Sequence, residues 1–324
     1  MMKRYLCLFL AILMLVGCFA GCGKETEKTP ETTEKQEDTL AVLEEPVLNV
    51  LMLGSSYSYY YCDELAAIAR ADGLKMEVGN LYISGGTVQQ HYEQFTQNKP
   101  IYEFVIHGKN GKESIKPATM QQALQARNWE LITIQESYDP GYNTYYPNSD
   151  VKSDEFVKKT VEELKKRFPD VQIAWHQVWS KAVGFKGALV DPNADIENCG
   201  MDERRQVRTA EKQQADYEVI RDCAIDLCKK YDMPRIPSGD AWQLARNHEK
   251  IEGLLTMADF NHDGEEGGGQ YLNACVWFEV LTGKSCIGNT FRPEYIYQDW
   301  DLSLSEEKID ILQKAAHEAV EENK

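Results

Sequence analysis

The stretch Val47-Leu48-Asn49-Val50-Leu51-Met52-Leu53-Gly54-Ser55-Ser56-Tyr57-Ser58 decides the fold class of this chain. Its short run of Val and Leu is typical of a strand that is buried on both faces. The run ends at Gly54, and a helical pattern follows as far as Gly73. A serine therefore lies where a central strand turns into a helix, a place where backbone N–H groups favour negative charge. Ser56 is a candidate nucleophile there, although Ser-Ser-x-Ser at a helix start is also an ordinary N-cap.

The chain beyond this stretch alternates between strand patterns and helix patterns. The strand patterns cover residues 76–83, 101–107, 114–115, 129–135, 171–176 and 235–237, and the helix patterns cover residues 87–96, 120–127, 154–168, 210–231, 239–248, 269–282 and 305–322. This alternation predicts one α/β domain over residues 47–324, a three-layer α/β/α sandwich around a parallel sheet. Ligands of such sheets bind beyond the carboxyl ends of the strands, where Ser56, Gly85, Gln135 and His176 each follow a strand.

The first 46 residues are not expected to join this domain. Residues 1–22 have a basic start and an apolar run from 6 to 16, which is typical of a targeting segment. Cys18 and Cys22 both follow small residues, as in bacterial lipoprotein boxes, and the polar sequence after Cys22 slightly favours that cysteine; a signal peptide without a lipid is the alternative. Residues 23–46, rich in Glu, Thr and Lys, predict a flexible linker. We therefore expect an extracytoplasmic protein that touches the cell membrane only through a lipid anchor.

Composition excludes several classes of partner. The net charge of −17 argues against binding to nucleic acid or to anionic lipid. The six cysteines after the targeting segment show neither CxxC spacing nor a disulfide framework, so we expect most of them to be buried thiols. No zinc pattern is present, and the sequence indicates no cofactor and no obligate protein partner.

A hydroxyl nucleophile needs a base, which is usually histidine. In the segment Asp259-Phe260-Asn261-His262, a carboxylate precedes a histidine by three residues, so one loop can supply both the base and the group that orients it. The same loop matches the start of a calcium loop, D-x-[DN]-x-[DN]-G. Its twelfth position is Gln270, which does not supply the bidentate carboxylate of such loops, yet calcium stays an alternative.

An acyl-transfer site also needs donors for the oxyanion. The candidates are the N–H of Ser56, the backbone at Gly85 after the second strand, and the amide of Gln135 after the third. Each has an ordinary structural alternative, because glycine also makes tight turns and glutamine also caps. Their occurrence at successive strand ends favours a site.

These residues resemble the motifs of a known superfamily. Residues 54–58 resemble the first block of the SGNH (GDSL-like) hydrolases, Gly85 resembles the glycine of the second, and Asp259-x-x-His262 resembles the last. More closely, residues 48–290 are similar to the DUF4886 branch, through Gly79-Asn80-Leu81-Tyr82-Ile83, Trp175-His176-Gln177-Val178-Trp179 and residues 274–283. The resemblance implies a flavodoxin-like domain and a metal-free serine esterase. Ser56, His262 and Asp259 would be its catalytic residues, and Ser56, Gly85 and Gln135 its oxyanion hole.

Two features set the chain apart from related patterns. The third block, usually Gly-x-Asn-Asp with Asn as an oxyanion donor, is Gln135-Glu136-Ser137-Tyr138 here, so the resemblance leaves the donor as Gln135 or Ser137. No G-x-S-x-G motif occurs, which counts against the α/β-hydrolase fold.

The substrate is expected to meet aromatic residues. His176, between Trp175 and Trp179, either lines the pocket or is a hydrogen-bonded structural residue, and Tyr138 opens a tyrosine-rich loop that either contacts sugar or covers the sheet edge. The main hypothesis is an esterase that removes O-acetyl groups from a glycan. A glycan-binding lipoprotein without turnover and a calcium-stabilised structural domain are the alternatives.

Overall fold

The computed structural model describes residues 47–108, 111–136, 153–180, 210–251, 268–294, 296–297, 300–301 and 303–324. They belong to one compact unit, Glu45–Lys324. The expected targeting segment, the lipidation candidates Cys18 and Cys22, and the linker lie outside the described residues. Among the helices that are described, none has the length and apolar character needed to span a bilayer.

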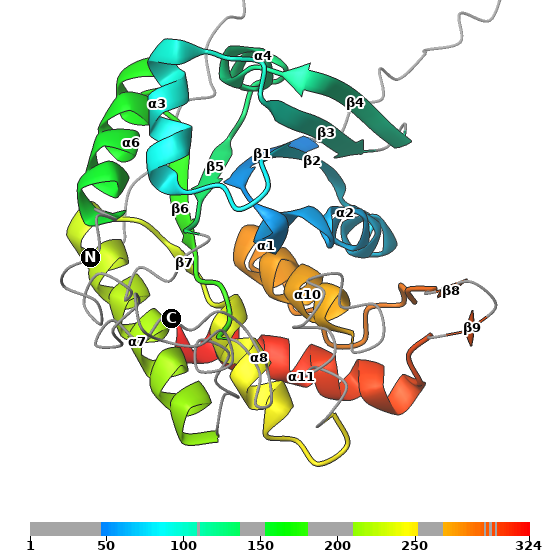
Figure 1. Ribbon diagram of the computed structural model, residues 1–324. Helices are drawn as coiled ribbons and strands as arrows, with labels where there is room; N and C mark the ends of the chain where they lie inside the picture. Colours follow the sequence, from blue (N-terminus) through cyan, green and yellow to red (C-terminus); the bar gives the residue numbers. More distant parts are fainter. Residues whose placement is uncertain are drawn as a thin grey trace, which may run out of the picture. The chain divides into compact units, whose positions relative to one another are not determined.

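The domain is built on a seven-stranded sheet with the order β4-β3-β2-β1-β5-β6-β7 (Figure 1). The strands are β1 Val47–Gly54, β2 Lys75–Tyr82, β3 Tyr102–Gly108, β4 Gly111–Ala118, β5 Leu131–Ile134, β6 Gln172–His176 and β7 Arg235–Ile236. The five strands from β2 to β7 pair in parallel, and the hairpin β3–β4 joins β2 antiparallel. Numbered along the chain, the parallel strands have the order 2-1-3-4-5, the flavodoxin-like order. The predicted fold class is confirmed.

Helices cover both faces of this sheet. One face carries α2 Cys62–Ala71, α8 Ser238–Arg246, α10 Gly269–Thr282 and α11 Glu306–Glu322; the other carries α3 Val88–Gln97, α4 Met120–Gln125, α6 Ser153–Arg167 and α7 Ala210–Tyr231 (Figure 1). The central strand β1 supplies both cores, because Val50 and Met52 point to the first layer while Leu51 and Leu53 point to the second. All four are at most 1% exposed, as expected for a strand buried on both faces. A separate pair of short strands, β8 Ile296–Tyr297 and β9 Trp300–Asp301, follows α10.

One predicted element is divided. The helix expected directly after Ser56 is a single turn, α1 Ser56–Tyr59, and the longer helix α2 begins only at Cys62. The dipole argument for Ser56 is correspondingly weakened, because four peptide units align few dipoles. By contrast, the helix expected at residues 87–96 is α3, and Thr87 begins it with a complete capping box to Gln90.

Candidate active site

The turn after β1 contains three serines in three different environments. Ser55 is fully buried and caps α1, where its Oγ accepts the Tyr57 N–H at 3.5 Å. Ser58 is 1% exposed, and its hydroxyl donates to the Ser55 carbonyl at 3.1 Å. Ser56 is half-buried, and its hydroxyl has no hydrogen bond to any residue in the described part of the chain. Ser56 is therefore the serine of this turn that is available to a substrate.

Gly54 allows this turn to form. A Cβ built on Gly54 would lie 1.8 Å from the Ser58 Oγ, a distance that no side chain can share. The absence of a side chain at Gly54 is what lets Ser58 fold back against the end of β1. The glycine between strand and serines is thus a packing requirement and not only a signal for a turn.

Ser58 is tied to the neighbouring strand β2 through Asn80. The Ser58 hydroxyl shares its one hydrogen between the Ser55 carbonyl and Asn80 Oδ1, which lies 3.3 Å away, and Asn80 Nδ2 donates to the Ser58 carbonyl at 2.9 Å. Asn80 is 1% exposed. Sequence reasoning assigned it no role, although alternation along β2 places Asn80 on the same face as the apolar Met76 and Val78. A single amide on an otherwise apolar strand face predicts a buried hydrogen bond, and this pattern could have pointed to the contact with Ser58.

Ser56 lies at the switch point of the sheet. The chain leaves β1 through α2 on one face and returns in β2, whereas it leaves the adjacent strand β5 toward α6 on the other face (Figure 1). The crevice between two such strands is where parallel α/β sheets bind their ligands. Ser56 follows β1, and Gln135 follows β5, so both lie at this place as predicted from the strand ends.

A chain of buried hydrogen bonds runs from this turn across the sheet. Gln135 Nε2 donates to Ser55 Oγ at 2.9 Å, His176 Nδ1 lies 2.8 Å from Gln135 Oε1, and His176 Nε2 lies 3.0 Å from Ser238 Oγ. Each of the four side chains is at most 2% exposed. Since Gln135 Oε1 can only accept, His176 carries its proton on Nδ1 and accepts the Ser238 hydroxyl at Nε2. Burial lowers the pKa of His176 to about 3, which keeps the ring neutral.

This chain corrects the expected role of Gln135. Its amide group is 2% exposed and is committed to Ser55 and His176, so it faces the core and not the space beside Ser56. Gln135 acts here as a support for the turn, and the structure does not favour it as a donor to an oxyanion. The alternative donor, Ser137, lies outside the described residues.

The expected contact of His176 and its two neighbouring tryptophans with substrate is also corrected. Trp175 and His176 are 1% exposed and Trp179 is 2% exposed. Trp175 packs in the core on the α3 face, while Trp179 stacks on Trp242 with 4.4 Å between ring centroids. His176 lies against the ring of Trp277 at 5.0 Å. Of the two interpretations left open, the structure supports the hydrogen-bonded structural histidine.

Gly85 lies at the same end of the sheet as Ser56. The Ile83 N–H donates to the Gly54 carbonyl at 3.3 Å, which joins the chain after β2 to the end of β1. Two residues later, Gly85 is exposed and has φ +62°, a conformation that side chains rarely adopt. Its position agrees with the expected oxyanion loop. Its positive φ also requires a glycine here whether or not the residue has a catalytic role.

Comparison with known proteins identifies the family. Residues 49–319 match the family described as "Domain of unknown function (DUF4886)". The chain belongs to the DUF4886 family. The match covers the whole sheet apart from the first two residues of β1, together with the turn that carries Ser56.

Solved structures similar to this DUF4886 chain include another family member. A DUF4886 family protein from Bacteroides uniformis ATCC 8492 has a TM-score of 0.65 and 24% identity, covering 85% of this chain and 95% of that one, and shows a shared fold. A candidate SGNH hydrolase from Slackia heliotrinireducens has a TM-score of 0.44 and 15% identity, covering 73% and 100%. An acetyl-xylooligosaccharide esterase from Geobacillus stearothermophilus, studied as a mutant, has a TM-score of 0.42 and 12% identity, covering 72% and 94%. No curated protein matches the chain.

Three predicted site residues of the DUF4886 chain cannot be placed. Asp259, His262 and Tyr138 lie outside the described residues, so their roles stay predictions. The described chain resumes at Gly268, and α10 begins with Gly269 and the buried Gln270. The described residues contain no group of three or more His, Cys, Asp or Glu side chains arranged to hold a metal ion. The possible calcium loop falls mostly in the undescribed stretch.

A second serine, histidine and carboxylate cluster lies elsewhere in the DUF4886 chain, between α10 and α11. Ser285 Oγ lies 3.3 Å from His317 Nδ1, and the same nitrogen lies 2.9 Å from Glu279 Oε2. A catalytic triad uses both ring nitrogens, one for the nucleophile and one for the acid. Glu279 also accepts the Cys286 N–H at 2.7 Å. This cluster therefore closes the turn after α10, and Ser56 stays the candidate nucleophile.

Proposed function

We propose that this protein is a serine esterase that removes O-acyl groups, acetyl above all, from carbohydrate outside the cytoplasm. The observation that carries the proposal is the selective availability of Ser56. Its two neighbours in the turn are buried and hydrogen-bonded, whereas Ser56 is half-buried at the sheet's switch point with its hydroxyl unengaged by described residues. A serine presented in this way is suited to attack a carbonyl carbon.

The proposed reaction proceeds in two steps. Ser56 Oγ attacks the ester carbonyl while His262 accepts its proton, and Asp259 orients the imidazole and stabilises its positive charge. The developing oxyanion is bound by the Ser56 N–H, which at the first helical position has no carbonyl partner within α1. The N–H of Gly85 and, in place of Gln135, the alternative donor Ser137 complete the donor set. The alcohol leaves with the proton from His262, and water then releases the acid from Ser56.

A fluorophosphonate probe tests the nucleophile directly. The protein from about residue 40 onward is treated with the probe and examined by intact mass and peptide mapping, with Ser56→Ala as the variant and Ser285→Ala as the matched control. We expect one adduct on Ser56, unaffected by Ser285→Ala and lost in Ser56→Ala. The same preparation is assayed with a short-chain ester, and full activity of folded Ser56→Ala would contradict the assignment.

The second candidate function is glycan binding without turnover. It is favoured by the position of Gln135, which is tied into the core where a donor to the oxyanion was expected. Under this alternative, folded protein gives no adduct and no ester hydrolysis, yet binds glycan equally well with and without Ser56→Ala. Esterase activity that depends on Ser56 excludes it.

The location is proposed from residues 1–22 alone. We propose that the protein is anchored by a lipid on Cys22, with Cys18 as the alternative site. Labelling of cells with a fatty-acid analogue, in the wild type and in Cys22→Ala and Cys18→Ala, distinguishes the two cysteines. A wild-type protein that is secreted without label would show an unlipidated signal peptide instead.

A further inference from the structure

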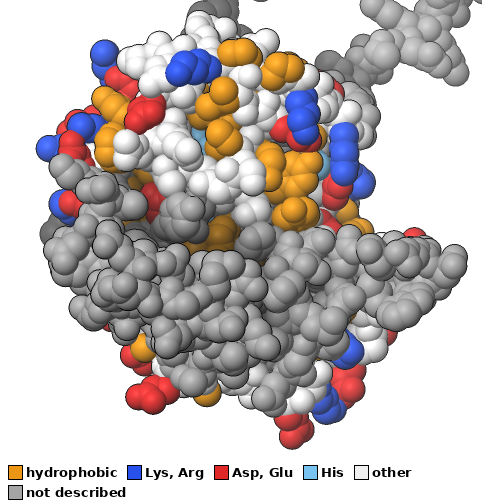
Figure 2. All heavy atoms as spheres, viewed as in Figure 1, with side chains coloured by type: hydrophobic (Ala, Val, Ile, Leu, Met, Phe, Trp, Pro, Cys, Tyr) orange, Lys and Arg blue, Asp and Glu red, His pale blue; other side chains and the backbone are white. Residues whose placement is uncertain are grey.

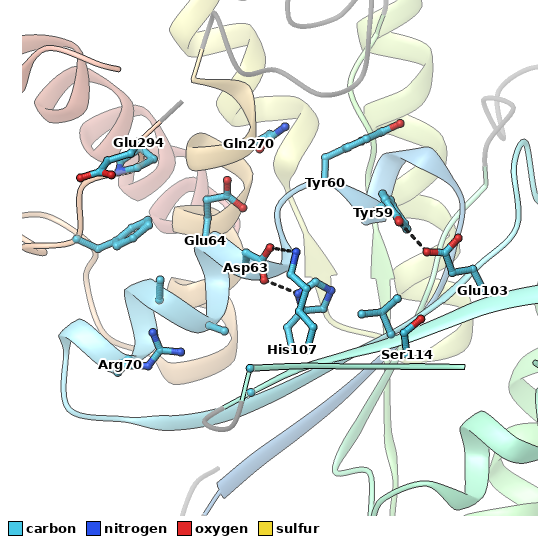
Figure 3. A pocket seen from close by; sticks show the side chains of 18 residues that line it. Tyr59, Tyr60, Asp63, Glu64, Arg70, Glu103, His107, Ser114, Gln270 and Glu294 are labelled. Carbon is cyan, nitrogen blue, oxygen red and sulfur yellow. Dashed lines mark hydrogen bonds and ion pairs between the residues drawn. The ribbon is translucent and has the colours of Figure 1, made fainter. Parts of the chain in front are cut away.

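A groove of about 770 Å³ lies on the sheet face that α2 covers (Figure 3). Its walls are the outer flank of α2 and the open face of the hairpin β3–β4, and the segment around Phe291 closes it on a third side. On the face seen in Figure 2, exposed hydrophobic side chains are grouped, with both acidic and basic side chains near them. A groove of this size falls within the range of ligand-binding sites.

One end of this groove lies beside the candidate active site. The strand register places Gly54 next to Tyr82, and Tyr82 next to Glu103. With neighbouring strands about 4.8 Å apart, Glu103 lies about 10 Å across the sheet from the strand end that carries Ser56. Tyr59 and Tyr60, which also line the groove, follow Ser56 by three and four residues. From Glu103 the groove follows β3 to Gly108, five residues or about 16 Å away.

The near end combines aromatic rings with a fixed carboxylate. The Tyr59 hydroxyl donates to Glu103 Oε1 at 2.8 Å, and Lys116 forms an ion pair with the same carboxylate. The hydrogen bond from Lys116 lowers the pKa of Glu103, so this group is an ionised acceptor. Tyr59 packs on Tyr82 with ring centroids 4.5 Å apart, which holds its ring in place. Flat apolar ring faces next to carboxylate oxygens are suited to a sugar, whose rings have apolar faces and hydroxyl donors at the edge.

The far end is also built from paired charges. His107 Nδ1 lies 2.5 Å from Asp63 Oδ1, and Lys112 pairs with the other oxygen of the same carboxylate. Burial alone would raise the pKa of Asp63, but the hydrogen bonds from His107 and Lys112 lower it to about 2. Among the described lining residues, Arg70 is the cation without an ion pair, and it lies on the last turn of α2, away from Tyr59. An anionic ligand at the near end would face Glu103 without a free cation beside it.

We propose that this groove, the Tyr59 groove, binds the carbohydrate chain of the ester substrate and selects uncharged sugars over acidic ones. The inference rests on the proposed function for the identity of the substrate. Tyr59 and Tyr60 contact sugar rings, Glu103 accepts their hydroxyl hydrogens, and the length along β3 accommodates more than one sugar unit. The acyl group then reaches Ser56, at the end of the groove where Tyr59 lies.

Binding is tested without turnover in Ser56→Ala. Calorimetric titration uses four neutral trisaccharides (xylotriose, cellotriose, mannotriose and chitotriose) and trigalacturonic acid as the anionic probe. We expect at least one neutral trisaccharide to bind and the anionic one to bind at least tenfold more weakly. Adding Tyr59→Ala to the Ser56→Ala protein is expected to lower the affinity for the neutral trisaccharide at least tenfold. Ile115→Thr, on the opposite face of the same hairpin, leaves its affinity unchanged.

Kinetics test whether the groove serves the reaction. In the protein with Ser56, Tyr59→Ala lowers kcat/KM for the acetylated form of the bound trisaccharide at least tenfold relative to kcat/KM for 4-nitrophenyl acetate. Failure of all four neutral trisaccharides to bind folded protein overturns the groove proposal, as does equal binding of trigalacturonic acid. Trisaccharide binding without any ester hydrolysis upholds the groove and overturns the esterase, so the two failures are distinguishable.

Discussion

Replacing His176 by Phe tests the buried chain that supports the Ser56 turn. The substitution keeps a ring between Trp277 and Tyr61 but removes both hydrogen bonds, leaving Gln135 Oε1 and Ser238 Oγ unpaired in a region at most 2% exposed. Each orphaned buried group costs about 1–3 kcal/mol. The expected loss is therefore about 2–6 kcal/mol of unfolding free energy, a large part of the roughly 5–15 kcal/mol of a typical domain. Urea unfolding measures it as a lowered midpoint at unchanged slope.

A double-mutant cycle with Ser238→Ala makes this test specific. Ser238→Ala alone leaves His176 Nε2 unpaired and is expected to cost about 1–3 kcal/mol. In the His176→Phe background the same change removes a hydroxyl that is already orphaned, so it costs nothing or restores stability. Additive effects, or a loss below about 1 kcal/mol for His176→Phe, would refute the reasoning.

The same histidine predicts acid sensitivity. Burial lowers the pKa of His176 to about 3 in the folded protein, and the ordinary value of 6.5 applies after unfolding. Between these values the unfolded chain binds the additional proton, so stability is complete above pH 6.5 and is lost as the pH falls. At pH 5 the loss from His176 is about 2 kcal/mol, and His91, whose pKa burial lowers to about 4, adds a similar amount. The groups facing His176 are Gln135, Ser238, Tyr61 and Trp277, none charged at this pH. His176→Phe should remove about half of the stability that is lost between pH 6.5 and pH 5. If the unfolding free energy of His176→Phe depends on pH as in wild type, the prediction is wrong.

Three further substitutions follow from the packing. Ser56→Ala should change the unfolding free energy by less than about 0.5 kcal/mol while abolishing ester hydrolysis, because the Ser56 hydroxyl makes no hydrogen bond to a described residue; urea unfolding beside the activity assay shows whether both hold. Asn80→Leu should cost about 1–3 kcal/mol, since it removes both buried hydrogen bonds between Ser58 and β2, and a thermal melt that matches wild type would exclude this role. Gly79→Ala should cost about 1–3 kcal/mol in urea unfolding, because its methyl would lie 2.6 Å from the Trp129 ring; an undiminished midpoint would show that the ring moves freely.

The fold was predictable because it depends on local patterns. The apolar run of β1, the capping sequence at Thr87 and the stop at Gly73 each act within a few residues, and together they fix a parallel sheet with two helix layers. The position of Ser56 followed from the same logic, because it depends only on where β1 ends.

The support of the site was not predictable in the same way. His176 and its two tryptophans gave one sequence pattern for two opposite roles, and the choice depends on which side chains β5 and α8 bring to the imidazole. The partners Gln135 and Ser238 lie 41 and 62 residues from His176. The Tyr59 groove depends likewise on strand register, which places Glu103 opposite Tyr82. Neither the hydrogen-bond partners of His176 nor the pairing of Glu103 with Tyr82 can be read from the spacing of residues in the sequence.

The two hydroxyls beside Ser56 explain how a single helical turn can hold a nucleophile in place. Ser55 is fixed to Gln135 after β5, and Ser58 is fixed to Asn80 on β2, so the turn is anchored to both strands that flank β1. Because α1 has only four residues, it cannot hold its own geometry by helical hydrogen bonds. The position of Ser56 is thus set by side chains on either side of it. A substitution at Ser55 or Asn80 should therefore lower kcat more than it raises KM, since attack at a carbonyl tolerates little displacement of the nucleophile.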